Sequence, residues 1–464
     1  MSECALQITG GTIVTEYGTF KANLGIDDEG KISHVVSPDV RLKSRETISA
    51  QGLLVLPGAV DSHTHLGDPG LTHREDFYTG TAAAAAGGIT TVLDHPQTKP
   101  IVDCLERFEE KRRTVSERAV VDFGLWGAVT PDNVSPRGSR SGELEKMVEA
   151  GACAFKGFMT FGSEMPRLHD GIIRAAFQRT APLGVPVGIH AENGELVKYM
   201  EEEFRATGQE DPLLHTVSRS EMTEVEAVSR LVFLAKDTGA RVHCVHLSVP
   251  ESVDVITAAR KDGYKMTAET CGHYLTLTSE ILSQKGAFGK CNPPLRSARC
   301  VEGLWDRLAR GEIHSMGSDH APYHPDEKRA DSFWSAPAGL TGTQLMPTLV
   351  LSECLRRGIP LELAVRILSS NNARIFGLYP KKGTIAPGSD ADLFFFDPKK
   401  RWVVTGEELL HKWKWCPFEG REITGKVRLT LVRGTVVFDD ERPERITVKP
   451  GHGKFVKPPR CCKG

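Results

Sequence analysis

The sequence lacks paired cysteines, long apolar runs and any excess of charge of one sign. Its eleven cysteines form no C-x-x-C pair, and no apolar run approaches the roughly 20 residues that a membrane-spanning helix needs. The 58 basic and 60 acidic side chains give a net charge of −2, which favours neither nucleic acid nor an anionic membrane as a partner. The N-terminus has no basic, apolar leader. We therefore expect a cytoplasmic protein whose partner is a small molecule.

No internal repeat is visible, but the two ends of the chain show the same sequence pattern. The first 55 residues and residues 383–446 both show short alternating runs separated by glycine and aspartate turns. This pattern predicts one small β-sandwich domain built from both termini. We place it at residues 1–55 plus 380–450, followed by a tail at 451–464.

The middle of the chain alternates between apolar, β-rich runs and helix-like stretches. The eight runs are LLVLPGAVDSHTH, GITTVLDHP, VVDFGLWGAV, ACAFKGFMTF, VPVGIHAEN, RVHCVHLSV, KMTAETCGHYL and IHSMGSDHAP. Strand–helix alternation favours parallel strands with right-handed crossovers, and eight units over about 320 residues predict a (β/α)8 barrel. We place this barrel at residues 56–379. An open doubly wound sheet is disfavoured because no G-x-G-x-x-G follows the first run.

Side chains at the carboxyl ends of barrel strands face the active site. The first run ends in His63 and His65, whose period-two spacing places both imidazoles on one face. The fifth run ends in His190, the sixth carries His246, and the eighth carries Asp319. Imidazole and carboxylate ligands suit Zn²⁺, with Mn²⁺, Co²⁺, Fe²⁺ or Ni²⁺ as alternatives.

Each of these signals is modest alone, because a single histidine is more often a structural residue than a metal ligand. Their convergence at the strand ends of one predicted barrel is what indicates a metal centre. Four other histidines near the same end have no spacing argument and are taken as structural: His95, His243, His273 and His324.

A lysine stands inside the fourth run, GACAFKGFMTF. A buried, unpaired ammonium at Lys156 costs several kcal/mol, so desolvation lowers its pKa and favours the neutral amine. A neutral amine can add CO2 to give an anionic carbamate, which can bridge two metal ions. Two alternatives stay open here: a plain salt bridge, and a Schiff-base lysine as in barrel aldolases, for which the histidines would be superfluous.

Several motifs, in this order, resemble those of the cyclic amidohydrolases, the group of dihydroorotases, hydantoinases or dihydropyrimidinases, and allantoinases. They are GAVDSHTHLGDPG, AFKGFMTF, GIHAEN, VHLS, KCNPPLR and GSDHAP. The stretch HTHLGDPGLTHREDF and the C-terminal third are most similar to allantoinases and L-hydantoinase-like members. The resemblance covers nearly the whole chain.

The resemblance implies a binuclear metal centre. His63, His65 and Asp319 would hold one metal ion, His190 and His246 the other, and carboxylated Lys156 would bridge them. Asp319 would also move the proton from the attacking water to the leaving nitrogen. In addition, Asn292 and Gly339 are implied to contact the substrate ring, and relatives of this group are often homotetramers.

Departures from the family patterns distinguish the possible substrates. Dihydroorotases carry a substrate-binding arginine where this chain has Gly67, so a dihydroorotase is disfavoured. Dihydropyrimidinases and D-hydantoinases carry a tyrosine where this chain has Phe161, which lacks the hydroxyl. Against an allantoinase, His95 in LDHPQTKP replaces the methionine that we would expect.

We therefore expect a hydrolase that opens a cyclic ureide, with allantoin to allantoate in purine catabolism as the leading hypothesis. The alternative is a hydantoinase or dihydropyrimidinase acting on 5-substituted hydantoins or dihydropyrimidines. A non-catalytic dihydropyrimidinase-like scaffold is disfavoured because all six ligand positions are intact.

Overall fold

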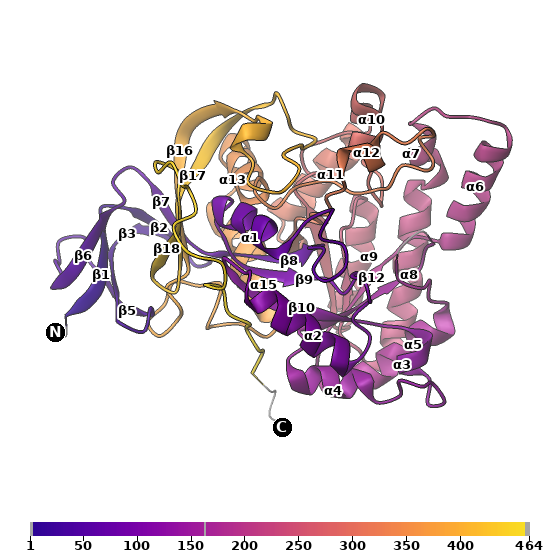
Figure 1. Cartoon of the computed structure of the whole chain (residues 1–464), viewed down its shortest axis with the longest axis horizontal. Helices are drawn as coiled ribbons and strands as arrows, with labels where there is room; N and C mark the ends of the chain where they lie inside the picture. Colours follow the sequence, from indigo (N-terminus) through magenta and orange to yellow (C-terminus); the bar gives the residue numbers. More distant parts are fainter. Residues whose placement is uncertain (1–2, 162–163, 460–464) are drawn as a thin grey trace.

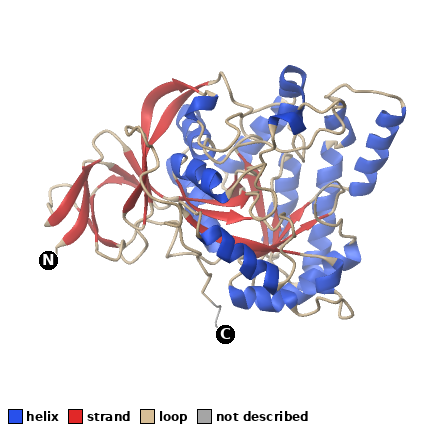
Figure 2. Ribbon diagram, viewed as in Figure 1, coloured by secondary structure: helices blue, strands red, loops and turns tan. Residues whose placement is uncertain are grey.

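The computed structural model describes residues 3–161 and 164–459, and its strands lie in two regions (Figure 1). A ring of parallel strands surrounded by helices makes up one region. Two smaller sheets, beside the N-terminus, make up the other, and Figure 2 shows the contrast between the helix-rich and helix-poor sides. This arrangement confirms the predicted (β/α)8 barrel with a small β-domain.

The barrel contains all eight predicted strands in sequence order. They are β8 (Ala59–Thr64), β9 (Ile89–Asp94), β10 (Asp122–Ala128), β11 (Ala154–Phe158), β12 (Val187–His190), β13 (Val242–Cys244), β14 (Met266–Cys271) and β15 (Ser315–Gly317). Each neighbouring pair is parallel. A parallel bridge between Thr64 and His320 joins the last strand to the first at the carboxyl edge. Nearly every strand residue is buried, because the interior covers one face and helices cover the other.

The larger helices connect successive strands. They are α1 (Phe77–Ala86), α2 (Leu105–Ser116), α4 (Glu143–Ala150), α5 (Asp170–Thr180), α6 (Gly194–Ala206), α8 (Glu221–Thr238), α9 (Pro250–Lys261), α11 (Ala298–Ala309) and α13 (Met346–Arg357). The Asp76 side chain caps α1 by accepting a hydrogen bond from Thr79 N, and Pro250 begins α9 at a position where its missing N–H costs nothing. The alanines of α1 let this helix pack closely between barrel and β-domain, where Thr430 Oγ1 donates to Ala85 O.

Shorter helices lie between these elements. They are α3 (Pro131–Val134), α7 (Leu214–Ser218), α10 (Glu280–Lys285), α12 (Pro325–Lys328), α14 (Leu361–Val365) and α15 (Asn371–Ile375). Among the described residues, no helix has both the length and the apolar character to cross a membrane.

The β-domain is formed by both ends of the chain, as their shared sequence pattern predicts. One sheet has the order β5 (Ile32–Val36), β4 (Asn23–Ile26), β1 (Cys4–Thr9) and β6 (Ser44–Ser49). The other has the order β18 (Thr435–Asp439), β17 (Glu422–Val432), β16 (Leu393–Val403), β7 (Leu54–Pro57), β2 (Thr12–Val14) and β3 (Thr19–Lys21). One apolar cluster includes Leu24 from the first sheet and Ile13 and Phe395 from the second.

Gly58 marks the passage from the β-domain to the barrel. It separates β7 from β8, and a Cβ there would lie 2.1 Å from Thr90 Oγ1 of the neighbouring barrel strand. Only glycine permits this close approach without movement of β9. The predicted limits of the domains, at 1–55 with 380–450, 56–379 and 451–464, stay a prediction.

The described part of the C-terminal tail lies along the barrel. Phe123 N donates to Lys454 O at 3.0 Å, Val456 N donates to Phe123 O at 2.8 Å, and Val456 is buried. Residues 454–456 therefore form a short parallel bridge to the start of β10. The Pro/Lys/Gly-rich sequence around Cys461 and Cys462 predicts that both are exposed, but they lie outside the described residues.

Candidate metal and substrate site

All ten residues predicted for the site line one pocket at the carboxyl end of the barrel. They are His63, His65, Gly67, Lys156, Phe161, His190, His246, Asn292, Asp319 and Gly339. They come from five strands or the loops that follow them and from residues 292 and 339, so only the closed barrel brings them together. The same wall includes residues that the sequence did not single out, among them Arg74, Gln97, Glu164 and Tyr323.

His63 and His65 face Asp319 across the seam that closes the barrel. His65 Nε2 lies 3.0 Å from Asp319 Oδ1, and His63 Nε2 lies 3.3 Å from the same oxygen. Burial lowers the pKa of His63 to about 4, so this ring is neutral and has a lone pair to offer. Burial by itself would raise the pKa of Asp319, but His63 and His65 hold it below its ordinary value.

His190 and His246 form a second pair beside the first. Their ring centroids are 4.5 Å apart, and His246 lies 5.2 Å from His63. The Nδ1 atom of His246 is buried and has no hydrogen-bond partner among the described residues. Burial also holds the pKa of both rings below the ordinary histidine value, so both are available as neutral ligands.

Lys156 is completely buried, and its Nζ has no hydrogen-bond or ion-pair partner among the described residues. Its Nζ lies 4.9 Å from the centroid of the Phe158 ring. Burial lowers the pKa of Lys156 to about 8, the direction that its place in an apolar strand predicts. No salt bridge satisfies this lysine in the described part of the chain, so one of the alternatives to carboxylation loses its support.

Two of the candidate ligands have a left-handed backbone. His246 has φ 43° and Asp319 has φ 45°, a conformation that costs a non-glycine residue about 1–3 kcal/mol. Their loops hold them there: His246 N donates to Glu269 Oε1 at 3.2 Å, and Ser318 N donates to Asp61 Oδ1 at 2.9 Å. Strain retained at two such positions is typical of functional sites.

Two buried glutamates orient the imidazoles, and sequence reasoning missed both. Glu269 Oε1 accepts from His63 Nδ1 at 2.8 Å, which leaves His63 Nε2 free for the pocket. Glu192 Oε2 accepts from His190 Nε2 at 2.6 Å and from Arg219 Nη1 at 2.6 Å. Carboxylate–histidine pairs of this kind set the orientation of a metal-binding ring. The spacing His190-x-Glu192 was a signal that could have been used.

Gly67 has no room for a side chain. A Cβ there would lie 2.3 Å from Leu71 O and 2.6 Å from Glu75 O, so an arginine would force the loop to move. Arg74 lines the same pocket, but it contacts Glu164 at 2.7 Å and Glu327 at 3.2 Å. This part of the pocket therefore offers no uncommitted guanidinium for a substrate carboxylate.

The other predicted substrate contacts, Asn292, Gly339 and Phe161, line the same pocket. The Oδ1 atom of Asn292 is buried and has no partner among the described residues, so it is an available acceptor. Gly339 lies against Tyr323, and a Cβ there would be 2.7 Å from the tyrosine ring. Phe161 is 40% exposed at the mouth, and Arg167 Cζ lies 4.6 Å from its ring centroid.

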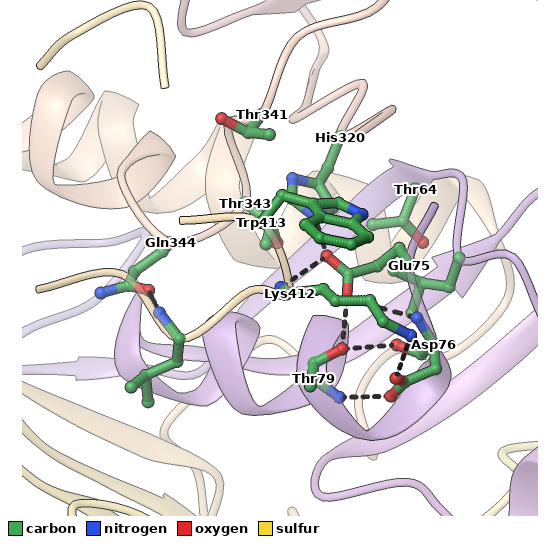
Figure 3. A network of polar contacts seen from close by, with 12 residues as sticks. Thr64, Glu75, Asp76, Thr79, His320, Thr341, Thr343, Gln344, Lys412 and Trp413 are labelled. Carbon is green, nitrogen blue, oxygen red and sulfur yellow. Dashed lines mark hydrogen bonds and ion pairs between the residues drawn. The ribbon is translucent and has the colours of Figure 1, made fainter. Parts of the chain in front are cut away.

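A segment of the β-domain fastens the loops around the pocket. We call residues 411–415, HKWKW, the strap; they lie between β16 and β17. Lys412 Nζ contacts Asp76 Oδ2 at 3.1 Å, and Lys412 N donates to buried Glu75, which also lies 3.4 Å from His320 Nε2 (Figure 3). Trp415 O accepts from Thr341 Oγ1, and Trp415 Nε1 donates to Tyr323 O. The strap thus joins the loops after β8 and β15 to residue 341.

The donor set suits divalent metal ions. Neutral imidazoles, one ionised carboxylate and buried nitrogens without partners converge on one pocket, and such atoms need a ligand from outside the chain. His63, His65 and Asp319 would hold one ion, and His190 and His246 the other, with Lys156 between them.

Comparisons with known proteins identify the family of the chain. A family model described as "Amidohydrolase family" matches residues 54–437. The chain is 37% identical over 439 residues to an allantoinase of Deinococcus radiodurans, covering 94% of this chain and 95% of the relative. It is also 37% identical over 464 residues to an allantoinase of Rubrobacter xylanophilus, covering 99% of each.

Solved structures show the same similarity. An L-hydantoinase (dihydropyrimidinase) from Arthrobacter aurescens superposes with a TM-score of 0.93 at 32% identity, covering 98% of this chain and 100% of the other. A dihydropyrimidinase from Brevibacillus agri superposes with a TM-score of 0.90 at 32% identity, covering 98% of each. The family match spans the barrel and much of the β-domain, and the relatives align over almost their whole length. The chain belongs to the amidohydrolase family.

Proposed function

We propose that this protein is a metal-dependent hydrolase that opens a cyclic ureide ring, and that its substrate is allantoin, which it converts to allantoate. The observation that carries the proposal is the convergence of four imidazoles, Asp319 and an unpartnered, buried Lys156 in one pocket. The allantoinases listed above, at 37% identity over nearly the full chain, support the choice of substrate.

The chain's own residues account for the steps around the bond that breaks. Two bound divalent ions would supply an activated water and polarise the ring carbonyl. Asp319, which stays ionised because its pKa is held low, would accept the proton of the attacking water and deliver it to the leaving amide nitrogen. The ring C–N bond breaks, and the product is a ureido acid. Asn292 would orient the ring through its free Oδ1.

The modification of Lys156 and the identity of the metal are part of the same proposal. We expect Lys156 to be carboxylated by CO2, and Zn²⁺ is the leading candidate for both positions, with Mn²⁺, Co²⁺, Fe²⁺ or Ni²⁺ as alternatives. As the family resemblance implies, we also expect a homotetramer, and we place the enzyme in the cytoplasm.

The pocket argues against dihydroorotate as the substrate. A substrate carboxylate buried without a cationic partner loses its hydration without compensation. Here Gly67 leaves no space for an arginine, and Arg74 is already paired with Glu164 and Glu327. A neutral ring such as allantoin has no such requirement.

A hydantoin or dihydropyrimidine is the second candidate substrate. The close superposition on an L-hydantoinase (dihydropyrimidinase) favours it. Phe161 counts against it, because this residue has no hydroxyl to donate to a developing oxyanion.

A panel of rings tests the proposal. The protein is loaded with Zn²⁺ or Mn²⁺ in bicarbonate buffer and given allantoin, hydantoin, a 5-substituted hydantoin, dihydrouracil and dihydroorotate, and release of the ring-opened acid is followed. We expect allantoin to be opened fastest and dihydroorotate not to be opened. Faster opening of a hydantoin or of dihydrouracil would favour the second candidate substrate instead. If none of the rings were opened, the result would contradict the proposal.

A further inference from the structure

His95 lies inside the cluster of candidate ligands, although no prediction placed it there. It follows β9 directly, and its ring stacks on His63 with centroids 3.8 Å apart and an interplanar angle of 9°. His65 meets it edge-on at 5.0 Å. One nitrogen from each of these three rings lies within 4.8 Å of the other two.

Both ring nitrogens of His95 are buried without a hydrogen-bond partner among the described residues. A neutral imidazole carries one N–H and one lone pair, and leaving a buried polar atom unsatisfied costs about 1–3 kcal/mol. The rings against it are those of His63, His65 and Trp126, whose faces accept no ordinary hydrogen bond. In contrast, His63 and His190 each pair one nitrogen with a glutamate. The chain itself therefore does not satisfy His95.

We propose that His95 is a third imidazole ligand of the metal position formed by His63, His65 and Asp319. The chain then gives this position three imidazole nitrogens and one carboxylate oxygen, besides the Lys156 group that both positions share. The His63 and His95 rings lie almost parallel, so His95 has to tilt for both lone pairs to reach one ion. The χ2 angle of histidine is broadly distributed, which makes that tilt inexpensive.

This assignment makes the two metal positions unequal. The His63 position gains a donor, while the His190 position has two imidazoles from the chain besides any group that both positions share. We expect the ion at the His63 position to resist a chelator longer than the other ion. The inference rests on the proposed function, because it requires that the pocket take up two ions.

The variant His95→Phe separates ligation from stacking, since phenylalanine keeps a ring against His63 but removes both nitrogens. His411→Phe is its matched control, because His411 is likewise a buried histidine whose two ring nitrogens have no partner among the described residues, but it is not grouped with His63 and His65 as His95 is. His95→Met, of similar volume, is made in parallel, and near-ultraviolet circular dichroism verifies that each variant is folded.

Metal content is measured by mass spectrometry after dialysis against increasing chelator, and the visible absorption of the Co²⁺ form is recorded. We expect His95→Phe and His95→Met to bind one of the two ions at least about tenfold more weakly, because even loss of a group that only supports a ligand costs 10–100-fold. We also expect their cobalt spectra to change, whereas His411→Phe behaves as the parent.

A parent protein that binds two ions, with His95 variants that keep both at parental affinity and with the parental cobalt spectrum, would overturn the role of His95 and leave the proposed function intact. A parent protein that binds no metal would overturn both.

Discussion

At the scale of single residues, the surroundings of each reactive side chain in the site set its protonation state. Lys156 is the clearest case, since burial lowers its pKa to about 8 although the carboxylates of Asp319 and Glu269 act in the opposite direction. At pH 7 roughly one amine in ten is then neutral, compared with about one in three thousand for an ordinary lysine. Only the neutral amine adds CO2, so burial of Lys156 in its strand favours the carboxylation proposed above.

The lowered pKa of Lys156 predicts how metal loading depends on pH. The neutral fraction rises as the pH passes upward through about 8, so bicarbonate-dependent recovery of activity in metal-depleted protein should speed up between pH 6.5 and 8.5. The check is the initial rate of reactivation at fixed metal and at a fixed partial pressure of CO2, so that dissolved CO2 is the same at every pH, with a CO2-free and bicarbonate-free control. A reactivation rate that falls with pH, or that ignores bicarbonate, would contradict carboxylation of this lysine.

We expect Glu269 to affect metal binding, although it contacts no substrate. The variant Glu269→Gln keeps the shape but removes the charge that His63 Nδ1 faces, so we expect about 10–100-fold weaker binding of one metal ion. Glu192→Gln should act in the same way at His190. Titration with a competing chelator measures both variants. If both kept parental affinity for both ions, the carboxylate–imidazole pairs would have no part in metal binding.

At the scale of elements, the strap controls the loop after β8. Lys412 holds this loop through Thr72 O and Asp76, and Trp413 Nε1 donates to His73 O at 2.9 Å (Figure 3). The loop in turn carries Gly67 and Arg74 into the pocket wall. Because the strap belongs to the β-domain, the accessory sheets take part in shaping the substrate site.

Lys412→Met tests this coupling. Loss of charge-assisted hydrogen bonds worth about 1.5–3 kcal/mol should loosen the loop, and we expect kcat/KM to fall about tenfold with both metal ions retained. Hydrogen exchange should accelerate in residues 67–76. Lys414→Met serves as the control, because the Lys414 side chain has no hydrogen bond or ion pair to these loops in the part of the chain that the structure describes. Unchanged exchange and unchanged kinetics in Lys412→Met would contradict a holding role for the strap.

At the scale of the whole molecule, a buried ion network joins barrel and β-domain. Lys382 Nζ contacts Asp122 at 2.5 Å, Asp392 at 2.7 Å and Asp390 at 2.9 Å, all of them buried. Arg433 contacts Asp122 as well. Asp122 begins β10 of the barrel, whereas Asp390 and Asp392 precede β16 of the β-domain. Removing the central cation would leave several buried carboxylates without compensation.

We therefore expect Lys382→Met to lower the free energy of unfolding by about 3–5 kcal/mol, as is typical when one partner of a buried ion network is removed. Its control is Lys31→Met, because Lys31 is partly exposed and contacts the same Asp390 at 3.8 Å. An exposed pair of this kind contributes about 0–1 kcal/mol. Denaturant titration of both variants gives the comparison, and equal losses would show that burial of the network is unimportant.

Much of the fold was predictable because the physical signals were local. The eight β-rich runs between helical stretches became β8–β15, and the pocket residues at their ends followed from barrel geometry. Glu269 was not identified and His95 was taken as structural, since a single glutamate or histidine in an apolar run has no spacing that marks it. The strap was also missed, because its contacts join residues more than 300 positions apart.

The most direct test of the account compares allantoin turnover by the parent protein and by Lys156→Ala, each loaded with metal in bicarbonate buffer. The account predicts that the parent opens allantoin with two ions bound. It predicts that the variant loses at least about a hundredfold in kcat/KM, because loss of a bridging group should exceed the 10–100-fold cost of losing an orienting partner. A Lys156→Ala variant that opens allantoin as fast as the parent would contradict it.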